Sequence, residues 1–164
     1  VAIGSNLTLS VTAGGSALKY QWQLNGKNIA GATHATYTLV DTSSRNSGTY
    51  RVVVTSGTFS TTSSGFLLTV LYPPTITTQP RPLTVKSGSS ATFTVKVSST
   101  STTPLGYQWT FNGAPLSDGP NLTGSLTPSL TITDVTSANA GPYQVVITNA
   151  AGTLTSASVK LTVK

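Results

Sequence analysis

The side chains of this chain that could take part in catalysis are few and far apart. His34 is the only histidine, and with Asp41 and one of many serines it could nominally form a catalytic triad. A triad needs three groups in fixed geometry and a site that binds the oxyanion, and the spacing here indicates neither. Because the chain has no cysteine, a thiol nucleophile, a thiolate metal site and disulfide bonds are all excluded. We therefore predict that the chain is not an enzyme and has no catalytic residues.

Oxygen ligands for a metal ion are equally scarce. The chain has no glutamate, and its three aspartates, Asp41, Asp118 and Asp134, are isolated from one another. A calcium site takes about six or more oxygen ligands. A self-formed isopeptide bond would need a lysine, an asparagine and a buried acid together, and only Asp41 or Asp134 could serve as that acid. We predict no metal site and no cofactor.

Three aromatic residues stand outside the core pattern described below and could contact a ligand. They are Phe59, Tyr72 and Phe111. Exposed aromatic rings can stack on sugar rings, so these residues suggest glycan binding, although single exposed apolar residues are ordinary. Asn6 and Asn121 begin glycosylation sequons, which matter only in a host that modifies them.

The composition indicates a β protein with a polar, weakly charged surface. Only 7% of the residues are charged, against about a quarter in ordinary soluble domains, whereas 31 are threonine and 22 are serine. Threonine favours strands because its branched Cβ packs well on a pleated surface. The net charge is +6, but the basic residues are scattered instead of clustered as in most nucleic-acid-binding proteins. We predict no nucleic-acid partner.

The chain contains no apolar stretch that approaches the length of a membrane span, about 18 residues. We therefore predict no membrane span. The chain starts at Val1 instead of a methionine, which suggests a processed, excised or incompletely traced polypeptide, and an exported precursor is consistent with this start. We expect an extracellular or cell-surface location.

A pattern of aromatic residues and glycines occurs twice and divides the chain. The motif Tyr-Gln-Trp occupies residues 20–22 and 107–109, and the motif Gly-x-Tyr occupies residues 48–50 and 141–143. Shifting residues 37–70 by 93 positions places them on residues 130–163 without a gap. A repeat of this length, built from short alternating segments, predicts two copies of one β-sandwich.

The alternation of apolar and polar residues predicts the same order of strands in both copies. The fold class is therefore all-β, with two tandem β-sandwich domains over residues 1–72 and 73–164. Asn25-Gly26 and Asn112-Gly113 are strong signals for two-residue turns. Pro73 and Pro74 lie at the join, and adjacent prolines predict a short, extended and semi-rigid linker.

The two copies differ at their leading edge. The second copy has the segment from Thr75 to Gly88 before its first core strand, whereas the first copy has only Val1–Gly4. We interpret the leading strand of the first domain as truncated: either it was lost from this fragment, or the native domain lacks it. An absent edge strand leaves unpaired backbone groups with which another chain can pair. This predicts protein–protein contact, with self-association as one form of it, through an open edge near Val1–Gly4.

The tryptophan strand, the Gly-x-Tyr strand and a closing Leu-Thr-Val together resemble tandem immunoglobulin-like domains of the intermediate type. The chain is most similar to the cysteine-free versions found in large bacterial surface and secreted proteins, and the resemblance covers nearly all of it. In such domains a tryptophan packs between the sheets, and the hydroxyl of a corner tyrosine reaches nearby backbone. The resemblance implies that Trp22 and Trp109 are core anchors and that Tyr50 and Tyr143 are corner tyrosines.

The chain departs from the family pattern in two ways. Valines stand where the inter-sheet disulfides would lie: Val11 with Val52, and Val95 with Val145. Aliphatic packing must replace each bridge, and a buried valine contributes about 1.5–3 kcal/mol. Asn46 and Asn139 replace the family's usual aspartate, so we expect no buried charge there.

We expect a non-catalytic structural or adhesive segment of an extracellular bacterial protein: a rod-like spacer, an adhesin stalk, or a subunit of a filament or sheath. The alternative is an accessory binding module, for example for carbohydrate, attached to a secreted enzyme. The mass of the intact native chain separates the two, since further repeats favour a stalk and a catalytic domain favours the module.

Overall fold

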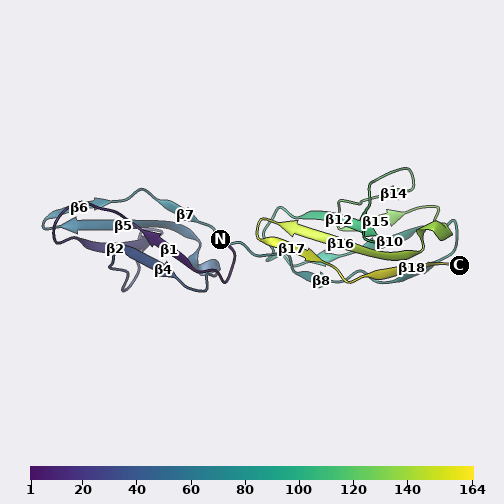
Figure 1. Ribbon diagram of the computed structural model, residues 1–164, viewed down its shortest axis with the longest axis horizontal. Helices are drawn as coiled ribbons and strands as arrows, with labels where there is room; N and C mark the ends of the chain where they lie inside the picture. The colour runs from purple at the N-terminus through teal and green to yellow at the C-terminus, as the bar shows by residue number, and fades with distance from the viewer. The chain divides into compact units, whose positions relative to one another are not determined.

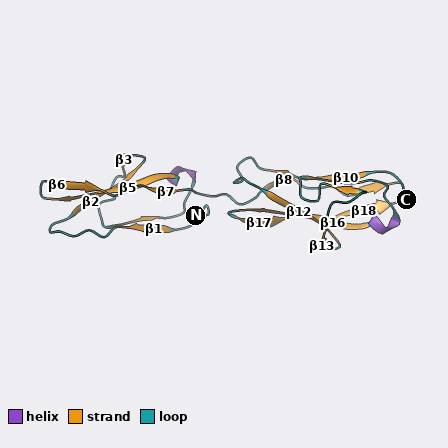
Figure 2. Cartoon of the chain, turned by 90° about the horizontal axis from the view of Figure 1, so that it is seen from above, coloured by secondary structure: helices purple, strands orange, loops and turns teal.

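The computed structural model describes all residues from Val1 to Lys164. The chain divides into a first unit, Val1–Leu71, and a second unit, Tyr72–Lys164 (Figure 1). Strands and loops make up both units, and the only helical segments are two short 3₁₀ helices, η1 (Ser44–Asn46) and η2 (Ser137–Asn139) (Figure 2). The prediction of an all-β chain is confirmed. Neither helix is long enough to cross a membrane.

The first unit consists of two sheets, and Figure 2 shows β1 in a layer apart from β2, β5 and β6. The smaller sheet pairs β1 (Leu7–Ser10) with β4 (Thr36–Leu39). The larger sheet has the order β3-β2-β5-β6, and β7 also pairs with β5. These strands are β2 (Lys19–Leu24), β3 (Lys27–Asn28), β5 (Gly48–Ser56), β6 (Phe59–Thr62) and β7 (Phe66–Leu68). Asn25 and Gly26 have positive φ, as the tight turn between β2 and β3 requires.

The second unit repeats this plan. One sheet has the order β10-β15-β14, and the other has the order β13-β12-β16-β18-β9, with β17 also paired to β16. The strands are β10 (Ala91–Thr94), β12 (Gly106–Phe111), β13 (Ala114–Pro115), β14 (Leu122–Thr123), β15 (Ser129–Ile132), β16 (Gly141–Asn149), β17 (Gly152–Thr155) and β18 (Val159–Val163).

Two strands of the second unit come before its first core strand, and no strand of the first unit corresponds to them. β8 (Ile76–Thr78) pairs antiparallel with β11 (Lys96–Val97). β9 (Leu83–Val85) runs parallel to β18. The second unit therefore has two additional strands. β8 and β9 lie one on each side of the gap between its two sheets.

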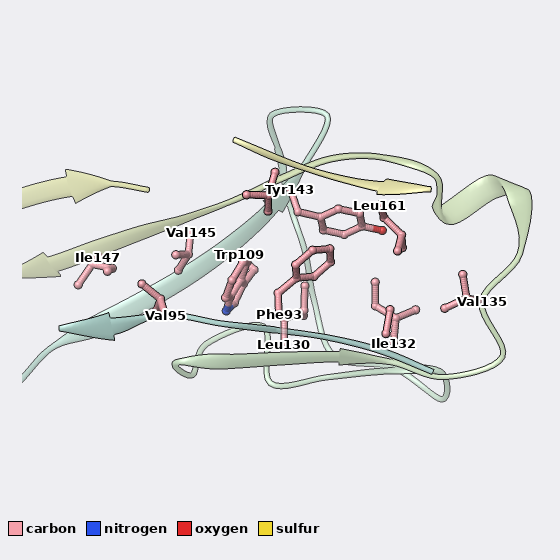
Figure 3. Packing of buried hydrophobic residues seen from close by; sticks show 12 residues of the cluster. Phe93, Val95, Trp109, Leu130, Ile132, Val135, Tyr143, Val145, Ile147 and Leu161 are labelled. Atoms are coloured by element: carbon pink, nitrogen blue, oxygen red, sulfur yellow. The ribbon is translucent and has the colours of Figure 1, made fainter. Parts of the chain in front are cut away.

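The core of the second unit surrounds Trp109, which is completely buried (Figure 3). The Trp109 ring lies 6.0 Å from the ring of Phe93, and Val145 is equally buried. The indole N–H donates to the backbone oxygen of Thr127 at 2.9 Å, so burial leaves no polar atom of the ring unpaired. Trp22 holds the same place in the first unit, where its indole N–H donates to a backbone oxygen at 3.0 Å.

Tyr143 ties its strand to the 3₁₀ turn that precedes it. Its hydroxyl donates to the backbone oxygen of Asn139 at 2.9 Å. The side-chain oxygen of Asn139 in turn accepts the backbone N–H of Thr136 at 2.8 Å. The first unit repeats this arrangement with Tyr50 and Asn46. A neutral amide thus holds each turn.

Because Tyr143 is buried, the second unit should lose stability as the pH becomes alkaline. Burial disfavours the phenolate and raises the pKa of Tyr143 from the usual 10.0 to about 12. Because the folded-state pKa lies above the unfolded-state value, this stabilising contribution is complete below about pH 10 and is lost as the pH rises to about 12. We expect the thermal midpoint of the second unit to fall across this window.

The variant Tyr143→Phe is the control, because it keeps the ring and removes the ionisable hydroxyl. It should be less stable at neutral pH by about 1 kcal/mol, the usual net value of one hydrogen bond. Its midpoint should fall less than that of the parent chain at alkaline pH. Thermal scans by circular dichroism, with tyrosinate absorbance followed in parallel, measure both effects. Equal alkaline losses in the two proteins would contradict the prediction.

Candidate functional site

The first unit has an opening between its two sheets that reaches its core. The volume of the opening is about 410 Å³. Thr8, Ser10, Ser63 and Ser64 supply its polar lining. Its apolar lining comes from β1, β2, β5, β7 and the residue that follows β1: Leu7, Leu9, Val11, Trp22, Tyr50, Val52 and Phe66. Of these residues Phe66 is 51% exposed and those of the first strand are half-buried, whereas Trp22, Tyr50 and Val52 are at most 5% exposed.

A second hollow lies further along the same strands of the first unit. Its volume is about 210 Å³, and its lining includes Ala13, Leu18, Val54 and Phe59. Ala13 follows Val11 on one wall, and Val54 follows Val52 on the other. The two hollows together extend along one side of the sandwich.

The equivalent side of the second unit is covered. Phe66 is 51% exposed in the first unit, whereas Val159, at the equivalent position of the repeat, is 6% exposed. Leu9 is half-buried, whereas its equivalent Phe93 is 1% exposed. β8 and β9 supply the cover, and Leu83 of β9 packs against the core. The units therefore differ in their covering strands, and the wall residues at these two positions differ as well.

The first residues of the chain do not fill the opening. The ammonium group of Val1 donates to the backbone oxygen of Thr69 at 2.9 Å. The N–H of Ile3 donates to the backbone oxygen of Leu71 at 2.8 Å. The N–H of Ser87 makes the same bond to the end of β18 in the second unit. These residues therefore pair with the last segment of the first unit and do not line the opening.

The unpaired backbone thus lies beyond the Val1–Gly4 segment that the sequence indicated. Thr12 and Ala13 belong to no strand, whereas β11, their equivalent in the second unit, pairs with β8. β7 pairs only with β5, whereas β18 also pairs with β9. The structure places one open edge on each side of the opening.

The comparisons with known proteins agree with this architecture. The sequence profile of the immunoglobulin domain matches residues 73–149. A three-domain fragment of titin matches 100% of the chain with a TM-score of 0.79 and 20% identity, and the chain covers 61% of that fragment.

Both units have the immunoglobulin fold.

Two further structures support this assignment of the fold. The N-terminal eight immunoglobulin domains of Down Syndrome Cell Adhesion Molecule match 99% of the chain with a TM-score of 0.80 and 19% identity, and the chain covers 23% of that structure. Extracellular domains 3–5 of Drosophila OTK match 100% of the chain with a TM-score of 0.75 and 19% identity, and the chain covers 58% of that structure. The chain is shorter than all three relatives. No curated protein matches it significantly in sequence.

The structure does not bring together the three aromatic residues that the sequence suggested as ligand contacts. Phe59 is 82% exposed on β6 of the first immunoglobulin-like unit, beside the second hollow. Phe111 and Tyr72 belong to the second unit. Phe111 is half-buried, and its ring centroid lies 4.8 Å from that of Tyr143. The backbone oxygen of Tyr72 accepts a hydrogen bond from Asn149 at 2.8 Å, at the opposite end of β16.

Two of the polar residues considered for catalysis or metal binding, His34 and Asp118, accept hydrogen bonds within their own units. His34 is exposed, and its backbone oxygen accepts the indole N–H of Trp22. Asp118 accepts the N–H of Ser125 at 2.7 Å and that of Gly124 at 3.1 Å. Hydrogen bonds from the side chain and N–H of Ser125, and from the N–H of Gly124, lower the pKa of Asp118. No group of three or more histidine or acidic side chains lies close enough to hold a metal ion.

The valines at the disulfide positions behave differently in the two immunoglobulin-like units. Val95 and Val145 are 4% and 0% exposed, and Val52 is 1% exposed. Val11 is only half-buried, because it lines the opening and no strand like β8 lies beside it. Both valines of the pair are therefore buried in the second unit, whereas in the first unit only Val52 is.

Sequence reasoning did not identify Leu9, Phe66 and Ser64 as lining residues. Leu9 and Phe66 look like ordinary core residues of an alternating strand, and Ser64 looks like a loop residue. The only signal was the difference in length between the leading segments of the two copies. That signal indicates a missing strand but not which side chains its absence exposes.

The equivalent residues Val11 and Val95 allow a direct test of whether the core of the first unit is less covered than that of the second. Val95→Ala should lower the free energy of unfolding of the second unit by about 2 kcal/mol, because it leaves a cavity in a closed core. Val11→Ala should cost less than half as much in the first unit, because its side chain is already half-exposed. Urea denaturation of the full chain, with Trp22 and Trp109 fluorescence in single-tryptophan backgrounds, separates the two units. Equal losses would show that Val11 is covered in solution.

Proposed function

We propose that this chain is a non-catalytic structural and adhesive segment of an extracellular bacterial protein, and that it associates with further copies of itself through the first unit. The observation that carries the proposal is the exposed apolar surface of that unit, where Phe59 is 82% exposed and Leu67 is 69% exposed. Exposed apolar surface of this kind favours association with another chain. The form it takes is a rod-like spacer, an adhesin stalk or a subunit of a filament or sheath.

The fold comparisons support adhesion by analogy. Down Syndrome Cell Adhesion Molecule is a cell adhesion molecule by name. The structure of the insect immune protein hemolin was described with implications for homophilic adhesion, and it matches with a TM-score of 0.65 and 22% identity. Identities this low carry the fold alone, so the role of this chain is our inference.

Self-association is the property to test first. Beads coated densely with the chain should aggregate, and sedimentation velocity should show oligomers whose share rises with concentration. Phe66→Lys and Leu67→Lys, which place a charge on the open edge of β7, should reduce both effects because edge charges prevent strand pairing. Leu67 is 69% exposed, so its substitution leaves the core intact.

The matched control is Thr153→Lys, an exposed position on β17 of the second unit, which should leave aggregation unchanged. Beads that stay dispersed, together with a monomeric chain at every concentration, would overturn self-association. Aggregation that both the Phe66→Lys and the Leu67→Lys variants retain would place the contact away from the edge of β7.

A second candidate is a glycan-binding module attached to a secreted enzyme. Phe59 favours it, because a ring 82% exposed beside a hollow is free to stack on a sugar. This role predicts binding to a glycan array that Phe59→Ala removes. Phe111→Ala is the comparison, since that ring already packs against Tyr143. A chain that binds no glycan on a broad array would eliminate this candidate.

A further inference from the structure

We infer that the outer face of the larger sheet of the first unit binds an anionic group of an acidic polysaccharide, and that Arg51 contacts the charge. The anionic group is a carboxylate or a sulfate ester. A hollow of about 320 Å³ forms the site. The inference goes beyond the self-association proposed above and does not depend on it, and the hollow shares no residue with the surface beside Phe59.

The hollow lies on the side of the sheet that faces away from the core. Gln23 of β2 pairs directly with Arg51 of β5, so both side chains leave the sheet on the same side. Trp22 and Val52, the neighbouring pair, point the other way and are buried. The remaining lining residues are Asn25, Gly26 and Thr49. The site therefore uses the face of the sheet opposite to the core.

Arg51 is the only charged residue of the lining, and its side chain has no partner within the chain. It is exposed and forms no hydrogen bond or ion pair. Asp41 is the only acid of the first unit, and it follows β4 of the smaller sheet, where its N–H donates to Asn6. No carboxylate of the unit neutralises Arg51, so its N–H donors are open to a ligand.

Gly65 leaves room beside the guanidinium of Arg51. A Cβ at this position would lie 3.3 Å from Nε and 3.6 Å from Nη2 of Arg51. The second unit has Ser158 at the position of Gly65 and Gln144 at that of Arg51. Of the two units, only the first therefore combines an arginine with a neighbouring glycine at this place.

The groups around the hollow match an acidic sugar. The guanidinium is a planar fork that binds two oxygens of a carboxylate or sulfate at once. Gln23, Asn25 and Thr49 add neutral amide and hydroxyl groups, which form hydrogen bonds with sugar hydroxyls. The amide of Gln23 donates to Asn28 at 2.9 Å, which leaves its side-chain oxygen as an acceptor. The site thus offers one positive charge among neutral hydrogen-bonding groups.

A second positive charge lies on the same face. Lys19 is exposed and pairs directly with Thr55, which is four residues from Arg51 on β5. The rise along a strand places these two charges about 13 Å apart. A polymer with repeated anionic groups can contact both, so a polysaccharide should bind more tightly than one free sugar.

The lining favours a sugar over an acidic protein. None of the five lining residues is apolar, whereas protein partners gain much of their affinity from a few buried anchors, aromatic side chains above all. A second copy of this chain is a poor ligand as well, because it has three aspartates and no glutamate. Of these, Asp118 already accepts two backbone N–H groups.

The probes are alginate, whose charges are carboxylates, dextran sulfate, and neutral dextran, each immobilised at the same density. The full chain should bind at least one of the two anionic polymers and not neutral dextran. Binding should weaken as the salt concentration rises, because exposed charges are screened. The comparison of alginate with dextran sulfate identifies the anionic group. A chain that binds neither anionic polymer at low salt would overturn the inference.

Two variants of equal charge separate the site from general attraction to a basic chain. Arg51→Gln installs the residue of the second unit and should weaken binding at least about tenfold, because a charge-assisted pair is lost. Its thermal midpoint should stay that of the parent, since the Arg51 side chain has no partner to lose. Arg45→Gln removes the same charge from an exposed position of η1 outside the hollow and should leave binding nearly unchanged. Equal losses in the two variants would reject the site.

A spectroscopic readout locates the ligand directly. In ¹H–¹⁵N spectra of the full chain, short alginate or sulfated dextran fragments should shift the Nε–H signal of Arg51 and the amide signals of Gly26 and Thr49. Fragments that bind without moving these signals would contradict the inference, as would binding that Phe59→Ala removes and Arg51→Gln retains. Polyglutamate that binds more tightly than both anionic polysaccharides would make the ligand an acidic protein instead.

Bead aggregation is measured without polysaccharide, so it tests self-association separately. Aggregation of the parent chain together with no polysaccharide binding would retain self-association and reject this site. Polysaccharide binding that depends on Arg51, in a chain that stays monomeric, would do the opposite.

Discussion

A two-sheet sandwich must keep water away from the strip of core between the edges of its sheets, and the behaviour of each unit depends on how it meets this requirement. The second unit covers the strip with β8 and β9, and Trp109 and Leu161 are completely buried. The first unit has equivalent wall strands without these two covering strands, and Phe66 remains half exposed. Because apolar burial is the main stabilising contribution, the uncovered strip contributes less to the stability of the first unit than the covered strip does to that of the second.

In both units the buried polar side chains form hydrogen bonds with the main chain instead of with charged side chains. The indole of Trp109, the hydroxyl of Tyr143 and the amide of Gln108 all donate to backbone oxygens. No buried side-chain nitrogen or oxygen lacks a partner. This arrangement suits a chain in which only 7% of residues are charged, since neutral hydrogen bonds are little affected by salt. The polar groups of the core are therefore paired by backbone groups of the same unit.

The two units combine different properties in one chain. The second unit is a closed sandwich whose flanking edges pair with its own strands β8 and β9. The first unit retains a complete set of core motifs and an unoccupied side. The two units therefore share their core motifs and differ in how far their cores are covered.

The sequence by itself determined the all-β class and the tandem sandwiches, because these follow from local properties. The alternation of Leu7 and Leu9 with polar neighbours specifies a strand with one buried face, and Asn25-Gly26 specifies a tight turn. Only the tertiary structure decided where the first unit is open. Phe66 and Val159 occupy the same step of the repeat, yet one is exposed and the other buried, because burial depends on the neighbouring strand as well as on the residue.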